Sequence, residues 1–435
     1  MSYYNFIFDI DKGNHLRLEN PFKYTISNDF SKQRVINSAF DVPNGFVKES
    51  SNEYQIWANL FFYRTNNNID FYCSTFKNKK DYFFYYIFFS HLVFMFSDVL
   101  KHIRHYIYFD LHKKIEQAIS NNCKIVLDSS RECADSSVNF DWDFFFNFTN
   151  LQPKNIIYIT GDINQKSKNN IPTVFYNYWE RYAGVKILNK QFNDTVKELS
   201  NKILNKEKRS WKGLCLNGAV KPHRITLCKY FHNNLQDSIN YSFSTFSYGK
   251  KVNNLKTIIS QTVKYFNDEE KHLTSWISIH GDKKLDNTKN QIHDVPVELH
   301  KNSYFYIVTE TKYNAQPELH ISEKIFKPIL CLQPFIAVAN PLVIDYLRKI
   351  GYDVFDDIMD HTYDTIVDNS KRMVLIKKEI TRLSKINDWP DILYSIHNRL
   401  LHNVNQLKLS FNRHSTIHNP LYKQDQLSYN NWLLK

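Results

Sequence analysis

Glycine and proline are scarce in this chain, whose 435 residues include only 9 Gly and 12 Pro. This scarcity argues against a collagen-like or linker-rich architecture, and against a fold with several glycine-rich phosphate loops. The 6 cysteines include no C-x-x-C pair and no close cluster with histidine, so we expect no zinc site. We interpret the cysteines as buried thiols in a reducing compartment.

Long hydrophobic runs are also missing. The most apolar stretch, residues 82–97 (YFFYYIFFSHLVFMFS), carries no Lys, Arg, Asp or Glu. It is shorter than the roughly 20 apolar residues that a membrane-spanning helix needs, so we predict a buried helix. Peripheral membrane contact through its aromatic side chains is the alternative. The first eleven residues lack the pattern of a signal peptide, and we expect a soluble, cytoplasmic protein without a transmembrane segment.

Aromatic and basic residues are abundant. The chain contains 33 Phe and 28 Tyr, and 43% of its residues are hydrophobic, which is ample for packed cores. Its length suggests about two domains. A formal net charge of +12 favours anionic partners such as a nucleotide, a nucleic acid or a membrane surface. A Lys-rich composition also follows from an AT-rich genome, so the charge alone does not choose among them.

The N-terminal half has the rhythm of a parallel α/β sheet. Residues 111–122 have helical spacing, and residues 124–127 and 155–160 read as short buried strands. Ligands of such sheets bind beyond the carboxyl ends of the strands. Asp128, Glu132 and Asp135 follow the first of these strands and are candidates for an acid–base role.

The C-terminal half alternates in the same way. We expect strands at residues 214–218, 303–310 and 334–339, and helices at 222–234, 321–332 and 341–351. Further helical spacing runs over 366–383 and 389–407. A charged amphipathic segment ends near residue 205, so we predict domains at 1–205 and 206–410, followed by a tail at 411–435.

The segment from Ser322 to Lys324 has the features of a nucleotide site. Ser322 is a suitable helix N-cap, the helix N-terminus favours anions, and Lys324 adds a positive charge there. The Glu323 carboxylate can accept hydrogen bonds from the hydroxyl groups of a ribose. An ordinary helix with an acidic first turn would look similar, because such a turn complements the helix dipole.

A second basic segment opens the C-terminal half. In LCLNGAVKPHR, Asn217 lies near the end of the predicted strand, and Lys221, His223 and Arg224 gather around a proline at a predicted helix start. Basic groups in this place can form a phosphate site without a glycine-rich loop. The alternative is a basic cluster on the surface.

These two segments together resemble the donor-binding region of the α-1,3/4-fucosyltransferases. The similarity covers mainly residues 210–360. It rests on Thr309-Glu310-Thr311 at a strand end, on the run from His320 to Lys324 at a helix entrance, and on residues 334–336 in the next strand. The chain departs from the family in a longer loop between Glu310 and Glu323, and in Asn340, near the place where the family commonly has Gly.

The resemblance implies a fold and a chemistry. The fold is α/β and GT-B-like, with two Rossmann-like domains facing a central cleft and helices at the C-terminus. The chemistry is inverting transfer of a sugar from a nucleotide-diphosphate donor, of which a GDP-linked sugar is one candidate, to a hydroxyl on a glycan or similar acceptor. No metal and no cofactor other than this co-substrate is expected, because Arg224 and Lys324 would compensate the charge of the leaving diphosphate.

The resemblance also assigns roles to residues. The donor site would comprise the two basic segments and the intervening strand end: Asn217, Lys221, His223, Arg224, Glu310, Ser322, Glu323 and Lys324. An acidic residue of the N-terminal domain would deprotonate the acceptor, with Glu132 the first choice and Asp128 and Asp135 the alternatives.

Two other functions fit the sequence. Basic residues alternate with aromatic ones at residues 77–86 and 250–265 and could contact a nucleic-acid backbone, so transfer of sugar to a modified base in DNA is one alternative. The other is a protein that binds a nucleotide or carbohydrate without catalysis.

Overall fold

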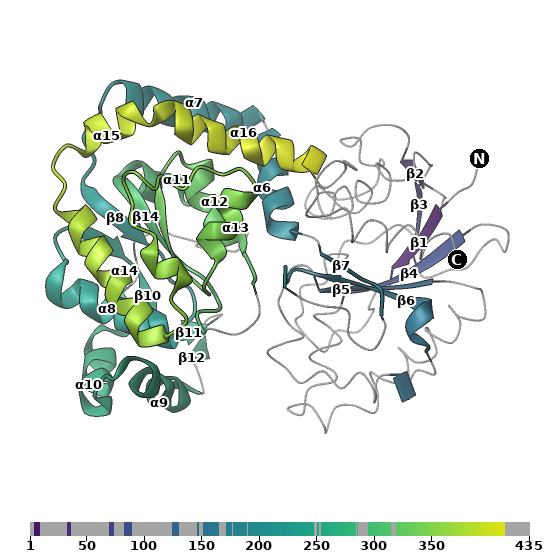
Figure 1. The fold of residues 1–435 in the computed structure, drawn as a ribbon, viewed down its shortest axis with the longest axis horizontal. Coiled ribbons are helices and arrows are strands. Elements are labelled where there is room, and N and C mark those ends of the chain that lie inside the picture. Colours follow the sequence, from purple (N-terminus) through teal and green to yellow (C-terminus); the bar gives the residue numbers. More distant parts are fainter. Residues whose placement is uncertain are drawn as a thin grey trace. The chain divides into compact units, whose positions relative to one another are not determined.

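The protein is described here by a computed structural model. It covers residues 151–164, 171–247, 250–283, 295–314 and 319–413, apart from residues 176, 189, 252 and 253, together with residues 146, 147 and 285 and five strands nearer the N-terminus. Residue contacts divide the chain into two compact units (Figure 1). One comprises Met1–Tyr182 with Ser410–Lys435, and the other comprises Ala183–Leu409. The predicted boundary near residue 205 falls inside the second unit, and the domain assignment stays a prediction.

The first unit contains a largely parallel sheet. Among its described residues, seven strands pair in the order β2-β3-β1-β4-β5-β6-β7, and only β2 runs antiparallel to its neighbour. The predicted strands at 124–127 and 155–160 are confirmed as β5 and β6. The strands are β1 (Tyr4–Phe8), β2 (Gln33–Val35), β3 (Ile69–Cys73), β4 (Tyr82–Phe88), β5 (Lys124–Ser129), β6 (Ile156–Thr160) and β7 (Thr173–Phe175).

One prediction for this unit is wrong. Tyr82–Phe88 is not the start of a buried helix but strand β4, which pairs in parallel with β1 and β5. A strand inside a parallel sheet has apolar side chains on both faces, so a continuous aromatic run suits it as well as it suits a buried helix. Residues 89–97 and the helix expected at 111–122 lie outside the described residues.

The second unit is built on a smaller sheet. Its four described parallel strands pair in the order β15-β14-β8-β9, with β14 and β8 at the centre (Figure 1). Every residue of β14 and β15 is buried, as their apolar sequences SYFYIVT and FIAV require. The strands are β8 (Trp211–Cys215), β9 (Ile239–Tyr241), β14 (Ser303–Thr309) and β15 (Phe335–Val338).

Helices follow these strands largely as the sequence predicts. The expected helix at 222–234 is α8, those at 321–332 and 341–351 are α12 and α13, and the helical spacing beyond 366 becomes α14, α15 and α16. Figure 1 shows α16 beside α7, where Ser200 Oγ lies 2.7 Å from His397 Nε2. The helices are α6 (Tyr178–Leu188), α7 (Lys190–Leu204), α8 (Pro222–Asn234), α9 (Leu255–Phe266), α10 (Glu270–His280), α11 (Val297–Lys301), α12 (Glu323–Leu330), α13 (Val343–Lys349), α14 (Asn369–Ser384), α15 (Trp389–Ser395) and α16 (His397–Arg413). Short elements complete the described residues: η2 (Pro153–Asn155), η3 (Thr362–Thr365), β10 (Phe243–Ser244), β11 (Phe246–Ser247), β12 (Lys250–Lys251) and β13 (Asp282–Lys283).

The order of strands in this sheet reverses between β8 and β14. The chain passes from β8 to β9 on one side, and then returns to place β14 and β15 on the other side of β8. The loops that leave β8 and β14 at their carboxyl ends therefore lead to different parts of the unit. In open α/β sheets, this is the point at which ligands bind.

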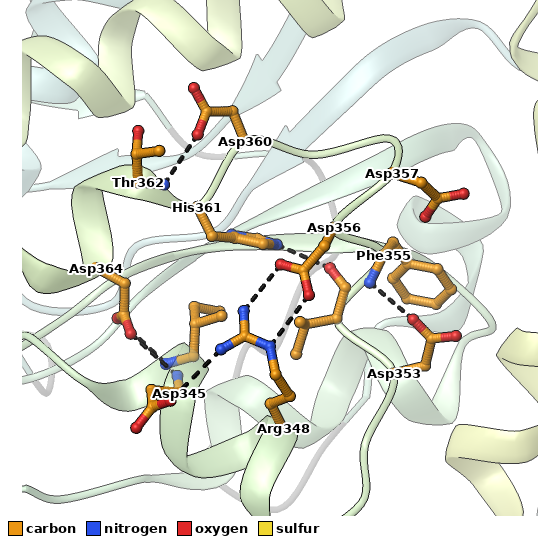
Figure 2. A network of polar contacts seen from close by, with 12 residues as sticks. Asp345, Arg348, Asp353, Phe355, Asp356, Asp357, Asp360, His361, Thr362 and Asp364 are labelled. Atoms are coloured by element: carbon orange, nitrogen blue, oxygen red, sulfur yellow. Dashed lines mark hydrogen bonds and ion pairs between the residues drawn. The ribbon is translucent and has the colours of Figure 1, made fainter.

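A polar network fixes the segment that follows β15 and α13. Figure 2 shows the Arg348 guanidinium on Asp356, with Nη2 and Nε at 2.8 and 3.0 Å from the two carboxylate oxygens. Asp364 accepts hydrogen bonds from the backbone N–H groups of Ile344 and Asp345, at 3.2 and 3.0 Å. It thus caps α13, whose preceding residue Leu342 supplies no side-chain cap and has a φ of 70°.

Over the part of the chain that the structure describes, we find no helix with the length and apolar character needed to cross a membrane.

Candidate functional site

The candidate site lies where β8 and β14 end and where α8 and α12 begin. Helix α8 has a proline at its first position, and helix α12 follows the N-cap Ser322. Each helix begins after the loop that leaves its strand, β8 for α8 and β14 for α12. All eight residues that the sequence assigns to the donor site belong to these ends. Hydrogen bonds and charge interactions link them into one cluster: Asn217, Lys221, His223, Arg224, Glu310, Ser322, Glu323 and Lys324.

Asn217 ties three strand ends together. Its Oδ1 accepts a hydrogen bond of 2.7 Å from the hydroxyl of Thr309, at the end of β14. Its Nδ2 donates to the carbonyl of Ser242 over 3.0 Å, and its backbone N–H donates to the Ser242 hydroxyl over 2.9 Å, just beyond β9. Because its amide is buried and hydrogen-bonded to Thr309 and Ser242, Asn217 holds the ends of these strands in place.

Arg224 joins α8 to the end of β14. Its Nη1 donates to the carbonyl of Ala219 at 2.8 Å, and its Nη2 donates to those of Thr309 and Glu310 at 2.8 and 3.2 Å. The residue is 3% exposed, and burial lowers the pKa of its guanidinium, which nevertheless stays charged in proteins. Its Nε is buried and has no hydrogen-bond partner among the described residues.

His223 is neutral in this structure. Burial lowers its pKa well below the ordinary value, and the neighbouring Arg224 acts in the same direction. Its Nε2 lies 2.9 Å from the Glu310 carbonyl, so this nitrogen carries the proton and donates it. The ring stacks on Tyr313, with centroids 5.2 Å apart. His223 therefore adds no positive charge to the site, whereas the partly exposed Lys221 at the N-cap of α8 does.

Glu310 connects β14 to the start of α12. Its Oε1 accepts from the backbone N–H of Ser322 at 3.1 Å, and its Oε2 accepts from the Ser322 hydroxyl at 2.5 Å. The carboxyl group is 1% exposed, and burial raises its pKa above the ordinary value. Ser322 also accepts from the backbone N–H of Lys324 at 3.4 Å, which confirms the predicted N-cap.

Glu323 and Lys324 form an ion pair at the surface of the cluster. The Lys324 Nζ lies 2.8 Å from Glu323 Oε1 and 3.1 Å from Ser322 Oγ. Their side chains are 22% exposed for Lys324 and 11% for Glu323. Burial raises the pKa of Glu323, but the attraction of Lys324 outweighs it, so that the pKa is lowered and the group is ionised.

Three residues that support this site could not be recognised from the sequence pattern. Ser242 follows a three-residue strand, and Tyr313 stands in a loop whose packing the pattern does not specify. Arg372, on α14, lies 4.1 Å from the Tyr313 ring centroid, contacts the Tyr313 carbonyl, and donates to the carbonyl of Ile366 at 2.6 Å. These partners are far apart in sequence, so only the tertiary structure brings them together.

The predicted bases belong to the first unit. Asp128 is the fifth residue of β5, where its backbone pairs with Phe88 and Ile159, so the expectation that it follows the strand is corrected. The sequence placed the end of this strand too early because the polar run DSS suggested a turn. Glu132 and Asp135 lie outside the described residues, and their role stays a prediction.

The described site presents groups that can contact phosphates and hydroxyls. Lys324 and the N-termini of α8 and α12 favour an anion, and an ionised Glu323 favours hydroxyl donors. Within the described ranges, His, Cys, Asp and Glu form no group of three or more that could hold a metal ion. Cys215, Cys228 and Cys331 are buried and free.

In comparisons with known proteins, no family model matches this chain, and no curated protein or solved structure is significantly similar to it. What the site binds is therefore inferred from its own residues.

Proposed function

We propose that the second unit binds a nucleotide-diphosphate sugar and that the chain is an inverting, metal-independent glycosyltransferase. One observation carries the proposal. The two segments that resemble a donor site lie nearly 90 residues apart in sequence, yet they meet where the strand order of the sheet reverses. Convergence of anion-binding and hydroxyl-binding groups at this point supports a nucleotide as the ligand.

The residues of the site have separable tasks in this proposal. Lys324 faces the diphosphate, the buried guanidinium of Arg224 adds its positive charge, and the backbone N–H groups at the start of α8 and α12 add to the positive potential. Glu323 accepts hydrogen bonds from the ribose. Asn217, His223, Glu310 and Ser322 hold these groups in place through the contacts described above.

The transfer step follows from this arrangement. As the bond from the sugar to the diphosphate breaks, negative charge grows on the leaving phosphate oxygen, and fixed cations stabilise it. A carboxylate of the first unit, with Glu132 the first choice, takes the proton of the acceptor hydroxyl as that oxygen attacks the sugar. The finer architecture, two Rossmann-like domains of GT-B type facing a cleft, is part of the same proposal.

Ligand binding tests the proposed site. We would screen GDP, UDP, ADP and CDP by thermal shift, since a ligand of the folded state raises the melting temperature, and measure affinity by calorimetry. Lys324→Ala removes a charge-assisted contact worth roughly 1.5–3 kcal/mol, so the dissociation constant should rise about tenfold or more. Lys378→Ala is the matched control, because Lys378 is an exposed lysine on α14. Equal affinity of the parent and Lys324→Ala proteins would refute the assignment.

A catalytically silent binding protein gives a different result. It would bind the nucleotide and lose affinity in Lys324→Ala, but it would release no free nucleotide from a bound nucleotide-sugar. Measuring that release over hours at saturating donor separates the two functions.

A further inference from the structure

Glu310 contacts both helices of the site from a single position at the end of β14. Its backbone carbonyl accepts hydrogen bonds from His223 Nε2 at 2.9 Å and from Arg224 Nη2 at 3.2 Å, both on α8. Its side-chain carboxylate accepts from the backbone N–H and the hydroxyl of Ser322, the N-cap of α12. The two helix N-termini are therefore held relative to each other by the residue that follows the central strand β14.

We propose that Glu310 is a positioning residue, which fixes Lys324 through the Ser322 hydroxyl and so sets the affinity of the site for a diphosphate. The inference rests on the proposed function. It assigns Glu310 a task different from direct donor contact, because the carboxylate is 1% exposed and both of its oxygens are used by Ser322.

The path from Glu310 to the ligand is short. The Ser322 hydroxyl donates to Glu310 over 2.5 Å, which leaves its lone pairs directed at the Lys324 side. There it accepts from the Lys324 Nζ at 3.1 Å and from the Lys324 backbone N–H at 3.4 Å. A lysine side chain is long and flexible, and ordering it on ligand binding costs conformational entropy. Because the Ser322 hydroxyl holds Lys324 in addition to Glu323, part of this cost is removed before a ligand binds.

Burial opposes the charge of the Glu310 carboxylate, so stability and ligand affinity need not respond to this group in the same way. The charged groups that face Glu310 are Lys324 and Glu323 from α12 and Arg224 from α8, while His223 is neutral. Burial raises the pKa of Glu310, and this effect is larger than the opposing effect of the Lys324 charge. A raised pKa in the folded state means that the folded chain loses stability as the pH rises through that pKa.

Glu310→Gln keeps the size of the side chain and removes the buried charge. At pH 8 the removal of the buried charge and the loss of a hydrogen bond to Ser322 act on the melting temperature in opposite directions, so nucleotide affinity is the readout. The affinity for whichever of GDP, UDP, ADP and CDP binds the parent most tightly should fall about five- to tenfold, since the amide cannot anchor Ser322 as the carboxylate does. Ser322→Ala should lower the affinity by a similar factor.

A double-mutant cycle tests whether Glu310 acts through Lys324. Glu310→Gln in the Lys324→Ala background should cost little further affinity, because the group that Glu310 positions is gone. Glu379→Gln is the matched control, because Glu379 is also a buried glutamate but lies on α14, outside the proposed site. Its carboxylate accepts a hydrogen bond from the backbone N–H of Asp360 at 3.0 Å. This control should leave the nucleotide affinity unchanged.

The outcomes separate the two proposals. A parent chain that binds none of GDP, UDP, ADP and CDP would overturn the proposed function and the positioning role with it. If the parent binds and Lys324→Ala weakens binding, but Glu310→Gln binds as tightly as the parent, only the role of Glu310 is refuted. Losses of affinity that simply add in the double variant would also contradict it.

Discussion

At the scale of single residues, the site depends on buried polar groups that a ligand does not touch. Asn217 and Arg224 use most of their hydrogen-bonding capacity on strand ends and loop carbonyls. The sequence identified both as site residues because each follows a strand or begins a helix. It could not separate the groups that hold the site from those that contact a ligand, since burial and partners depend on residues far along the chain.

Asn217→Ala provides a test of this supporting role. The substitution leaves the Thr309 hydroxyl and the Ser242 carbonyl without their buried partner, so the free energy of unfolding should fall by about 1–3 kcal/mol. Urea denaturation measures this change. Asn234→Ala is the control, because the exposed Asn234 donates only to a carbonyl of its own helix and should change stability much less. A urea midpoint of Asn217→Ala equal to that of the parent would contradict the supporting role of Asn217.

At the scale of elements, local signals located the helices of the second unit better than the strands of the first. Proline at the start of α8 and serine before α12 are strong start signals, and both helices begin where they indicate. The run that became β4 carries no such signal, and its continuous apolar character does not distinguish a buried strand from a buried helix. Pairing with β1 and β5 decides between them.

Helix α16 is held to the segment after α13 by an ion-pair network. Arg399 binds Asp357 with Nη1 and Nη2 at 2.8 and 2.7 Å, and its Nη2 also lies 2.9 Å from Asp353 Oδ1. The hydrogen bonds from Arg399 lower the pKa of Asp357. For Asp353, burial acts to raise the pKa, but Arg399 and the Phe355 N–H outweigh it, and the pKa is again lowered.

This network predicts a pH dependence of stability. A carboxyl with a lowered pKa stabilises the folded state above the pKa of the unfolded chain, near 4, and loses that contribution as the pH falls through the lowered value. Arg399→Ala should therefore reduce stability at pH 7 by about 1 kcal/mol, a modest value because the network is partly exposed. The difference from the parent should shrink below pH 4. Thermal melts across pH 3–7 measure it, and a difference that does not depend on pH would contradict the account.

At the scale of the whole molecule, the alternation of strands and helices indicated an α/β protein, and the structure confirms the mixed α/β class. The site in the second unit could be predicted because its chemistry lies in two short segments with helix-start signals. The base could not be fixed in the same way. Several carboxylates follow or end one strand of the first unit, and sequence spacing does not rank them.

Glu132→Gln addresses the base while retaining side-chain size and hydrogen-bonding reach. General-base assistance contributes about 10²-fold to 10⁴-fold, so turnover should fall by that order. Binding of the nucleoside diphosphate should stay close to that of the parent, because the proposed donor site uses residues of the second unit. Full activity of this variant would move the role to Asp128 or Asp135.

The most direct test of the central claim is the release of nucleoside diphosphate from a nucleotide-sugar by the full chain in excess chelator. Water serves as the acceptor when none is added, so the measurement does not require the natural one. The account predicts release by the parent chain with and without the chelator, strongly reduced release by Glu132→Gln, and weaker donor binding by Lys324→Ala. Tight donor binding without any release by the parent would show that the chain is not a transferase of this kind, and release that the chelator abolishes would contradict metal-independent catalysis.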